Sequence, residues 1–320
     1  MAKDLGISHM TVSRALRGQA NVKPETLKAI LERAKDLGYV PSAAANTMRG
    51  MATPVVGLLL PNLANDFYAS FANRFVLACD AWGLVVIIQV TTDEPRLEDM
   101  ALRRLREQGV KKIVMVPTPS SGDALRPYLK GARILQLIRH ENLPVPSQSL
   151  LSDEIAAFDA AVRDLKTTGH SRIGYIGGDI SMSTGRARLL AFETALAQNG
   201  LLANSDNIIN GRPNRKTGAA GLSELLALKE PPSAVMCGGL EISSGALQTL
   251  LENDVAMPEQ IAFVGYGDPT HYRWLAKGIS TIAVPTDALA DMAAALIGDD
   301  ASEAVNQKAV AATYIKRATT

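Results

Sequence analysis

Apolar residues recur at helical spacing in the first fifty positions of the chain. In "SHMTVSRALRG", Val12, Ala15 and Leu16 fall on one face, and the remaining positions are polar or basic. Ser8 is a typical N-cap residue and Gly18 a typical helix terminator, so we expect a helix between them. The sequence offers the polar and basic side chains on the other face of this helix no binding partner within the protein.

A second amphipathic helix is predicted in "NVKPETLKAILERAKDLGYVP". Pro24 suits the first helical position, and an apolar stripe continues up to Gly38. The stripe consists of Leu27, Ile30, Leu31, Ala34 and Leu37. A short helix in "MAKDLG" can add Ala2 and Leu5 to the same small core, which predicts a three-helix unit. So few buried residues give only marginal stability.

Beyond Thr53, short β-rich runs alternate with amphipathic stretches. The runs are "VVGLLLP", "LVVIIQV", "KKIVMVP", "RILQLI", "RIGYIGG", "SAVMCGG", "IAFVGYG" and "ISTIAVP". Stretches such as "FYASFANRFVLACDAWG" and "GRARLLAFETALAQNG" are long enough for crossover helices, which predicts a doubly wound α/β architecture with parallel sheets in two lobes. Ligands bind such sheets at the carboxyl ends of strands. The expected cleft loops follow Pro61, Val90, Pro117, Gly178, Gly239 and Gly267.

Composition narrows the class of protein. The chain has 320 residues, of which 47% are hydrophobic and 20% charged, which suits a soluble globular protein of two or three domains. No apolar run reaches the roughly 18 residues of a membrane span, and the N-terminus does not resemble a signal peptide. We therefore expect a cytoplasmic protein. Cys79 and Cys237 have apolar neighbours and no CxxC spacing, so buried thiols are favoured over a disulfide or a metal site.

Charge is distributed unevenly along the chain. Residues 1–50 carry eight Lys and Arg against four Asp and Glu, a balance of +4, so the other 270 residues sum to −3 within the net +1. A basic N-terminal part on a mildly acidic remainder favours contact with a polyanion. On charge alone, ordinary solvated charge is the alternative.

Two sequence motifs, "TVSRALRG" and "LGYVP", are specific to one protein family when they occur at this separation. With the intervening sequence they resemble the DNA-binding head of the LacI family of bacterial transcription regulators, and the resemblance continues through nearly the whole chain. It implies that the second helix lies in the major groove of DNA. Base reading then falls to His9, Met10 and Arg14, of which Arg14 can offer two donors to guanine. The remaining DNA contacts from this helix are assigned to Ser8, Thr11, Ser13 and Arg17.

Residues 41–50, "PSAAANTMRG", have the composition of a linker. The resemblance implies that they form a hinge helix when two subunits meet on DNA. Met48 then occupies the position of the lever that enters the minor groove, and Asn46 also contacts DNA. A disordered tether is the alternative in the absence of DNA. The first helix is shorter than in the family, so we expect the true start codon to lie upstream.

For the rest of the chain the resemblance implies a periplasmic-binding-protein-like domain. It places a helix-turn-helix DNA-binding domain at 1–50 and an effector-binding and dimerisation domain at 51–320. The N-lobe spans 54–153 and 283–308, and the C-lobe spans 154–282 and 309–320. Because no apolar heptad tail follows the strand "AVAATYIKRA", a homodimer is expected rather than a tetramer.

The resemblance assigns Arg188 to the effector pocket between the lobes. Aromatic and polar residues in "NDFYASF" and "PTHYRWL" are further candidates to line it. The full set is Asn65, Asp66, Phe67, Tyr68, Arg188, Gly239, Asp268 and Trp274, with Tyr272 as an additional aromatic. Gly239, Leu240 and Gly267 stand where the family often has hydrogen-bond acceptors. An anionic ligand such as a sugar acid is therefore expected over a neutral sugar.

Enzyme chemistry finds little support in the sequence. The glycines of "GYIGGDISMSTGRARL" do not match G-x-G-x-x-G, and a P-loop motif does not occur. The four histidines are widely separated, and His170 is a better turn residue than ligand. We therefore predict a DNA-binding regulator, a repressor controlled by a sugar or sugar acid, without cofactor or metal. A dehydrogenase-like or sugar-processing α/β enzyme is the alternative.

Overall fold

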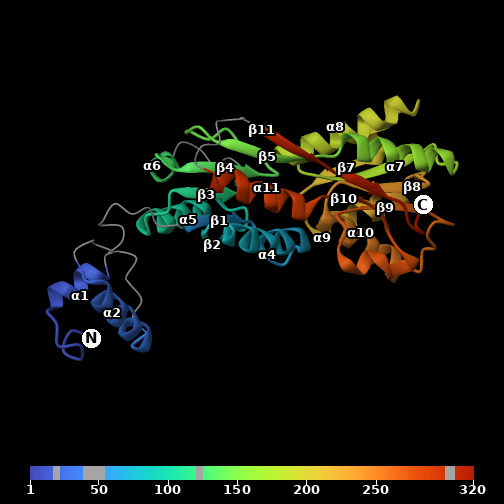
Figure 1. Ribbon diagram of the computed structural model, residues 1–320. Coiled ribbons are helices and arrows are strands. Elements are labelled where there is room, and N and C mark those ends of the chain that lie inside the picture. The colour runs from blue at the N-terminus through green and yellow to red at the C-terminus, as the bar shows by residue number, and fades with distance from the viewer. Residues whose placement is uncertain (17–21, 39–54, 120–124, 300–306) are drawn as a thin grey trace. The chain divides into compact units, whose positions relative to one another are not determined.

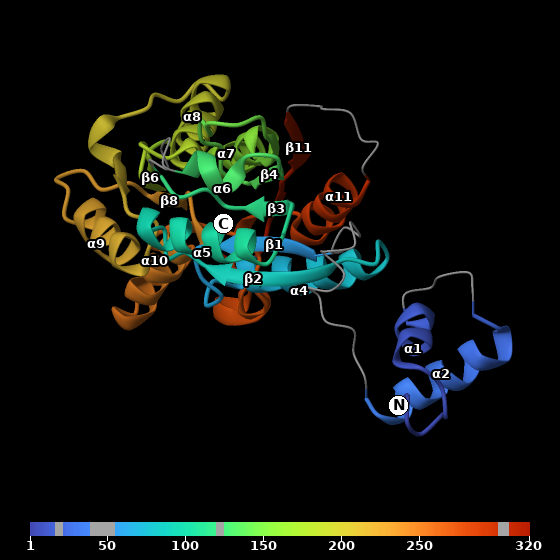
Figure 2. The same cartoon turned by 90° about the vertical axis from the view of Figure 1, so that its left-hand side faces the viewer.

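The computed structural model describes residues 1–16, 22–38, 55–119, 125–299 and 307–320. The chain divides into two units, Met1–Thr53 and Pro54–Thr320, which we call the head and the body. Figures 1 and 2 show the elements of each unit. No helix in the described part of the chain is long and apolar enough to cross a membrane.

Two helices form the described part of the head. Helix α1 spans His9–Ala15, and the side chain of Ser8 caps it by accepting a hydrogen bond from the Thr11 amide. Helix α2 spans Pro24–Asp36, begins with proline, and is followed by Gly38 at a φ of 58°. Both predicted helices are confirmed, although Gly18 lies outside the described residues.

The core of the head is smaller than the sequence predicts. Val12, Ala15 and Ile30 are buried at its centre, with Leu5 and Leu27 packed against them. Leu31 and Leu37 were expected in the same stripe, but 52% and 49% of their surfaces are exposed. The apolar stripe of α2 is therefore only partly covered by the described residues.

The predicted first helix is wrong. Residues 2–6 form turns, in which Leu5 and Ile7 donate backbone hydrogen bonds to Met1 and Ala2. A single turn cannot propagate a helix, because most of its amides and carbonyls lack helical partners. An ion pair of 2.7 Å between Asp4 and Arg33 instead ties this segment to α2.

The body contains two six-stranded sheets, each of which forms one lobe. The N-lobe sheet has the order β11-β5-β4-β3-β1-β2, and all its pairings are parallel. Its strands are β1 (Val55–Leu60), β2 (Val85–Val90), β3 (Lys112–Met115), β4 (Arg133–Leu137), β5 (Gln148–Asp153) and β11 (Gln307–Ala311). The central strands β1, β3 and β4 are mostly buried apolar runs, which is typical of parallel sheets.

The C-lobe sheet has the order β12-β10-β9-β8-β6-β7. Its strands are β6 (Ile173–Gly178), β7 (Ile208–Gly211), β8 (Ala234–Cys237), β9 (Ala262–Tyr266), β10 (Ser280–Ala283) and β12 (Thr313–Ile315). Only the pairing of β10 with β12 is antiparallel among them. The predicted two-lobed, doubly wound α/β fold is confirmed, while the predicted C-terminal strand is split at Ala312, where the chain passes between sheets.

Helices cover both faces of each sheet. In the N-lobe, α4 (Asp66–Asp80) and α11 (Thr286–Gly298) cover one face, and α5 (Pro95–Glu107) and α6 (Arg126–Leu129) cover the other. In the C-lobe, α7 (Ile155–Thr167) and α8 (Ser183–Gln198) lie opposite α9 (Arg215–Leu226) and α10 (Leu240–Glu252). Short 3-10 turns occur at Ser205–Asn207, Thr270–Arg273 and Leu275–Lys277.

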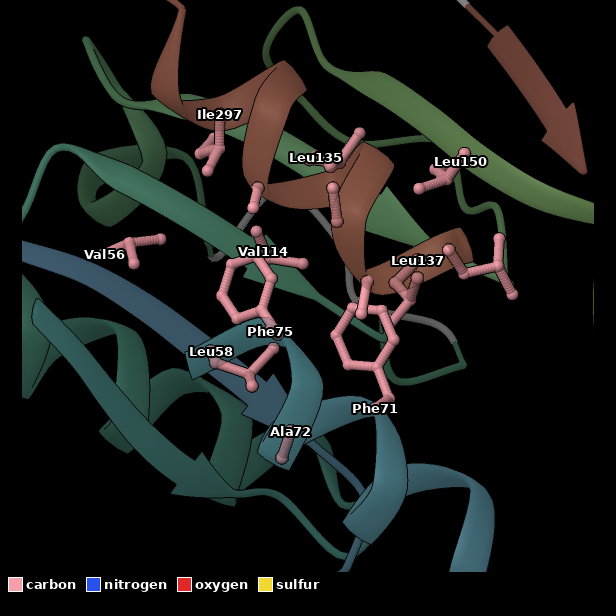
Figure 3. Packing of buried hydrophobic residues seen from close by; sticks show 14 of the residues in the cluster. Val56, Leu58, Phe71, Ala72, Phe75, Val114, Leu135, Leu137, Leu150 and Ile297 are labelled. Atoms are coloured by element: carbon pink, nitrogen blue, oxygen red, sulfur yellow. The ribbon is translucent and has the colours of Figure 1, made fainter. Parts of the chain in front are cut away.

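Stacked aromatic rings fill the centre of the N-lobe. Phe71 and Phe75 of α4 stack with ring centroids 5.5 Å apart. Figure 3 shows both rings among apolar side chains of the sheet and of α11, such as Leu58, Leu137 and Ile297. This core fixes the N-terminal end of α4 next to the carboxyl ends of the strands, where the cleft lies.

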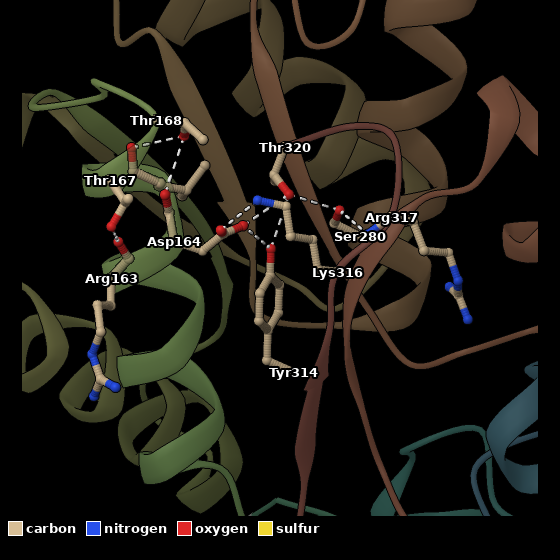
Figure 4. A network of polar contacts seen from close by, with 10 residues as sticks. Arg163, Asp164, Thr167, Thr168, Ser280, Tyr314, Lys316, Arg317 and Thr320 are labelled. Atoms are coloured by element: carbon tan, nitrogen blue, oxygen red, sulfur yellow. Dashed lines mark hydrogen bonds and ion pairs between the residues drawn. The ribbon is translucent and has the colours of Figure 1, made fainter.

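The C-terminal segment is fastened to α7 by polar contacts. Asp164 accepts hydrogen bonds from the Tyr314 hydroxyl (2.7 Å), the Lys316 ammonium (2.6 Å) and the Thr320 hydroxyl (3.1 Å), as Figure 4 shows. These bonds hold the pKa of Asp164 below its ordinary value although burial acts in the opposite direction. The network keeps β12 on the C-lobe sheet.

Candidate functional site

A cleft opens between the carboxyl ends of the two sheets. From the N-lobe it is lined by Pro61, Asn62, Asn65, Asp66, Phe67, Tyr68, Ser70, Asp93, Ile138 and Arg139. From the C-lobe it is lined by Thr184, Arg188, Pro213, Gly239, Leu240, Glu241, Tyr266, Gly267, Asp268 and Pro269, with Val284 and Thr286 at a crossing between lobes. Most of the expected loops meet here, as the carboxyl-end rule predicts.

Seven of the eight predicted effector residues lie in this lining, and Trp274 does not. The Trp274 side chain is 67% exposed, because it sits between two short 3-10 turns outside the lined cleft. Tyr272 does not line the cleft either, since it is fully buried in the core between the C-lobe sheet and α9 and α10. The aromatic wall therefore comes from Phe67, Tyr68 and Tyr266.

Arg188 is held in place by three groups of the C-lobe. Its Nε lies 3.4 Å from Glu154 Oε1, its Nη1 donates to the Gly238 carbonyl at 3.1 Å, and its Cζ lies 4.2 Å from the centre of the Tyr266 ring. The Tyr266 hydroxyl donates to the same Glu154 oxygen at 2.6 Å. Burial lowers the pKa of Arg188, but Tyr266 and Glu154 outweigh it and raise the pKa above its ordinary value. The guanidinium is charged, fixed and already paired.

A second buried guanidinium approaches the cleft from the N-lobe. Arg139 Nη1 lies 2.6 Å from Asp93 Oδ1 and 2.9 Å from the Pro117 carbonyl oxygen, and only 5% of the side chain is exposed. Its neighbour Ile138 has a φ of 52°, a strained conformation for a β-branched residue. Sequence reasoning missed this pair, because its two members are 46 positions apart and belong to no motif.

Hydrogen-bond acceptors are more numerous in the cleft than the sequence suggested. Asp93 and Glu241 join the expected Asp66 and Asp268 in the lining. Asp268 is held by Arg317 at 2.8 and 2.9 Å. The preceding position turns with a φ of 80°, which glycine adopts without strain. A glycine there therefore serves the turn, while the acceptors come from other loops.

The N-terminus of α4 forms one corner of the cleft. The Asn65 side chain caps this helix by accepting from the Phe67 amide at 3.0 Å. Phe67 and Tyr68 meet edge to face with ring centroids 5.4 Å apart, and burial raises the pKa of Tyr68. These residues supply a flat apolar wall and one hydroxyl group.

The predicted DNA-reading residues lie on α1 and at its cap. His9, Met10 and Arg14 are exposed, whereas Thr11 and Ser13 are half-buried. The Ser8 hydroxyl is exposed but already hydrogen-bonded to Thr11. The remaining predicted DNA contacts, Arg17, Asn46 and Met48, lie outside the described residues, as does the whole predicted hinge helix at 41–50.

Other candidate chemistry has structural explanations. Cys79 and Cys237 are buried free thiols, as predicted, and burial raises the pKa of each to about 12. His170 contacts the Ser233 hydroxyl at 3.0 Å and follows α7 in a turn, which agrees with its predicted role. In the part of the chain that the structure describes, groups of three or more metal-ligating side chains do not occur.

Comparison with known families covers nearly the whole chain. Residues 53–318 match the family of periplasmic binding proteins and sugar binding domains of the LacI family, and residues 1–42 match bacterial regulatory proteins of the lacI family. The HTH-type transcriptional repressor PurR of Haemophilus influenzae is 25% identical over 285 residues, which are 88% of this chain and 84% of PurR. Catabolite control protein A of Priestia megaterium is 26% identical over 273 residues, which are 83% of this chain and 80% of that protein.

Solved structures share the fold. The lac repressor dimer bound to operator and the anti-inducer ONPF aligns with a TM-score of 0.84 at 19% identity, covering 99% of this chain and 97% of the repressor chain. The complex of the regulator CelR with cellobiose aligns with a TM-score of 0.75 at 23% identity, covering 100% and 98% of the two chains. The relatives named above are regulators rather than enzymes. The chain belongs to the LacI family of bacterial regulatory proteins and is a DNA-binding helix-turn-helix transcriptional regulator.

Proposed function

We propose that the protein is a repressor that binds a palindromic operator as a homodimer and is controlled by a small hydroxyl-rich molecule in the cleft. The observation that carries the proposal is the cleft itself, in which Arg188 is fixed at the carboxyl ends of two parallel sheets. In this proposal residues 1–50 read the DNA, and the two lobes of 51–320 bind the effector and the second subunit.

The exposed face of α1 supports the DNA-reading role. We assign base contacts to His9, Met10 and Arg14, and phosphate contacts to Thr11 and Ser13. Because Val12 and Ala15 hold the other side of α1 in the core of the head, this face points away from that core, as a helix that enters a major groove requires. The family resemblance adds Arg17, Asn46 and Met48 to the proposed contacts.

Charge pairing in the cleft changes the expected class of effector. Arg139 and Arg188 line the cleft, but each already has a carboxylate partner within the protein. Four carboxylates, those of Asp66, Asp93, Glu241 and Asp268, line the same space. The last three have arginine partners as well, namely Arg139, Arg215 and Arg317. An anion would find each guanidinium of the lining already neutralised by a carboxylate, whereas neutral hydroxyl groups can donate to carboxylates and accept from guanidinium groups. A neutral sugar or polyol is therefore favoured over the sugar acid expected from the sequence.

A thermal-shift screen of neutral sugars, sugar acids, sugar phosphates and nucleobases tests this proposal. A neutral sugar at a hundred times its Kd is expected to add about 2.7 kcal/mol to the stability of the folded state. Arg188→Met should abolish the shift. Lys229→Ala should preserve it, because Lys229 is exposed and does not line the cleft. A preference for anions, or binding that survives Arg188→Met, would contradict the assignment.

An exposed apolar patch on the N-lobe supports the homodimer. It consists of Val76 and Leu77 on α4, Trp82 in the following loop, and Val85 and Val90 on the edge strand β2. Leu77 and Val85 are each 60% exposed, which is unusual for neighbouring apolar residues on one surface. An unpaired edge strand beside them needs cover as well. A second copy of the chain can bury both.

Leu77→Glu is expected to raise the dimer dissociation constant at least about tenfold, because it places a charge in the buried centre of the proposed contact. Leu190→Glu on α8 is the matched control, since Leu190 is similarly exposed at 63% but lies outside this patch. Sedimentation analysis of both variants measures the effect. Equal dissociation of both variants, or of neither, would place the interface elsewhere.

A further inference from the structure

Basic side chains gather at the end of the N-lobe sheet opposite the cleft. Arg104 and Arg106 lie in the last turn of α5, Lys111 precedes β3, and Lys130 follows α6. All four are exposed, and they make no ion pair with another described residue. We call these four residues the basic edge.

The fold brings the basic edge together from three elements. The Arg133 amide donates to the Lys111 carbonyl at 2.7 Å, and Lys112 is in register with Arg133 across β3 and β4. Buried leucines of α5 and α6 share one apolar cluster on this sheet, so the ends of both helices stay close to the starts of the strands (Figure 1). The four charges therefore lie along one end of one sheet.

Other described charged side chains also lie at this end. Lys112 and Arg133 bind carbonyl oxygens of Gly298 and Asp299 at the end of α11. Arg103 is paired with Glu107 at 3.0 Å. Among the described residues, Asp80, Glu107 and Asp299 are the acidic side chains of the same helix ends and loops. Among these described side chains positive charge is in excess, although residues 51–320 as a whole carry a negative balance.

The two ends of the N-lobe sheet differ in charge, because the carboxyl ends of the strands carry three aspartates, one of which is paired with Arg139. Asp66, Asp93 and Asp153 lie at or just after the carboxyl ends of strands. The basic edge lies at the starts of strands, including the start of β1, where Val56 is in register with Lys112. Polarised charge of this kind orients a protein toward a polyanion.

The chain enters the body at the same edge. Residues 39–54 connect Gly38 at the end of the head to Val55 at the start of β1. A fully extended chain covers at most about 3.5 Å per residue, so the 17 steps of chain keep Gly38 within about 60 Å of Val55. Linked weak contacts benefit from a high effective concentration at such distances.

We propose that the basic edge is a second DNA-contacting surface, which binds phosphates of the duplex held by the head. This proposal rests on the proposed DNA binding by the head. The contacts that it adds come from the body and do not depend on the DNA sequence. Exposed Arg and Lys side chains suit phosphate oxygens, and displaced counterions make such contacts strongly dependent on salt. The edge therefore strengthens binding to any duplex, including DNA beside the operator.

A salt titration of binding to a long duplex of arbitrary sequence tests the proposal. The probe variant combines Arg104→Gln, Arg106→Gln, Lys111→Gln and Lys130→Gln. Each lost phosphate contact reduces the slope of log K against log salt by about 0.9, so a reduction of about 2 to 4 is expected. Affinity at about 50 mM salt should fall at least tenfold. An unchanged slope would overturn the proposal.

A charge-matched variant separates the basic edge from net charge. It combines Arg212→Gln, Lys216→Gln, Lys229→Gln and Lys277→Gln, which remove four exposed positive charges from the C-lobe. Its slope should stay within about one of the parent protein. Equal losses in both variants would attribute the effect to overall charge and would also overturn the proposal. Equal melting temperatures of all three proteins show that the comparison is between folded molecules.

Discussion

Replacing Glu154 with alanine is expected to lower the free energy of unfolding of the body by about 3 kcal/mol. The side chains of Glu154 and Arg188 are only 6% and 15% exposed, so water compensates poorly for the lost carboxylate. The guanidinium would keep its hydrogen bond to the Gly238 carbonyl but lose its counter-charge. The Tyr266 hydroxyl would lose its acceptor at the same time.

Two further variants separate the causes of this loss. Glu154→Gln keeps an acceptor for Tyr266 and removes only the charge, so it should be less damaging than alanine. Combining Glu154→Leu with Arg188→Met removes both charges and should recover most of the stability, since a buried pair is often replaceable by apolar side chains. Urea denaturation of the three proteins gives the values. A loss of under about 1 kcal/mol in Glu154→Ala would show that the pair is solvated.

Local patterns in the sequence were sufficient for most of the fold. The eight predicted strand segments all contain strands, because β-branched and other apolar residues dominate each of them. Ser8, Pro24 and Gly38 marked helix ends correctly, since capping depends on neighbouring residues alone. The weak strands β5 and β7 were missed, because "QSLLSD" and "IING" mix polar residues into short segments.

The chemistry of the cleft was predictable only in part. Arg188 came from a family resemblance and the corner at Asn65 from the residues of "NDFYASF", and the structure places both in one lining. The partners of the two buried guanidinium groups, Asp93 and Glu154, are separated from them by 46 and 34 positions, so spacing gave no signal. Trp274 was misplaced because a local aromatic pattern does not indicate which side of a turn faces the cleft.

Arg14→Ala is expected to weaken binding to operator DNA by about 1 to 3 kcal/mol and to relax base preference at one position of each half-site. Arg14 is exposed in the last turn of α1, and it makes no ion pair with another described residue. Its planar guanidinium can donate two parallel hydrogen bonds to guanine O6 and N7, which no other side chain of α1 can reproduce. The loss should therefore be specific to sequence as well as large.

Duplexes selected from a random library by the parent protein supply the operator for this measurement. Arg14→Lys keeps the charge but loses the fork, so it should retain binding to arbitrary DNA and still lose the base preference. Lys28→Ala removes a positive charge from the exposed side of α2 and should weaken binding to all sequences alike, if at all. Because a phosphate contact carries no sequence information, an unaltered base preference in Arg14→Ala would reassign this residue to the DNA backbone.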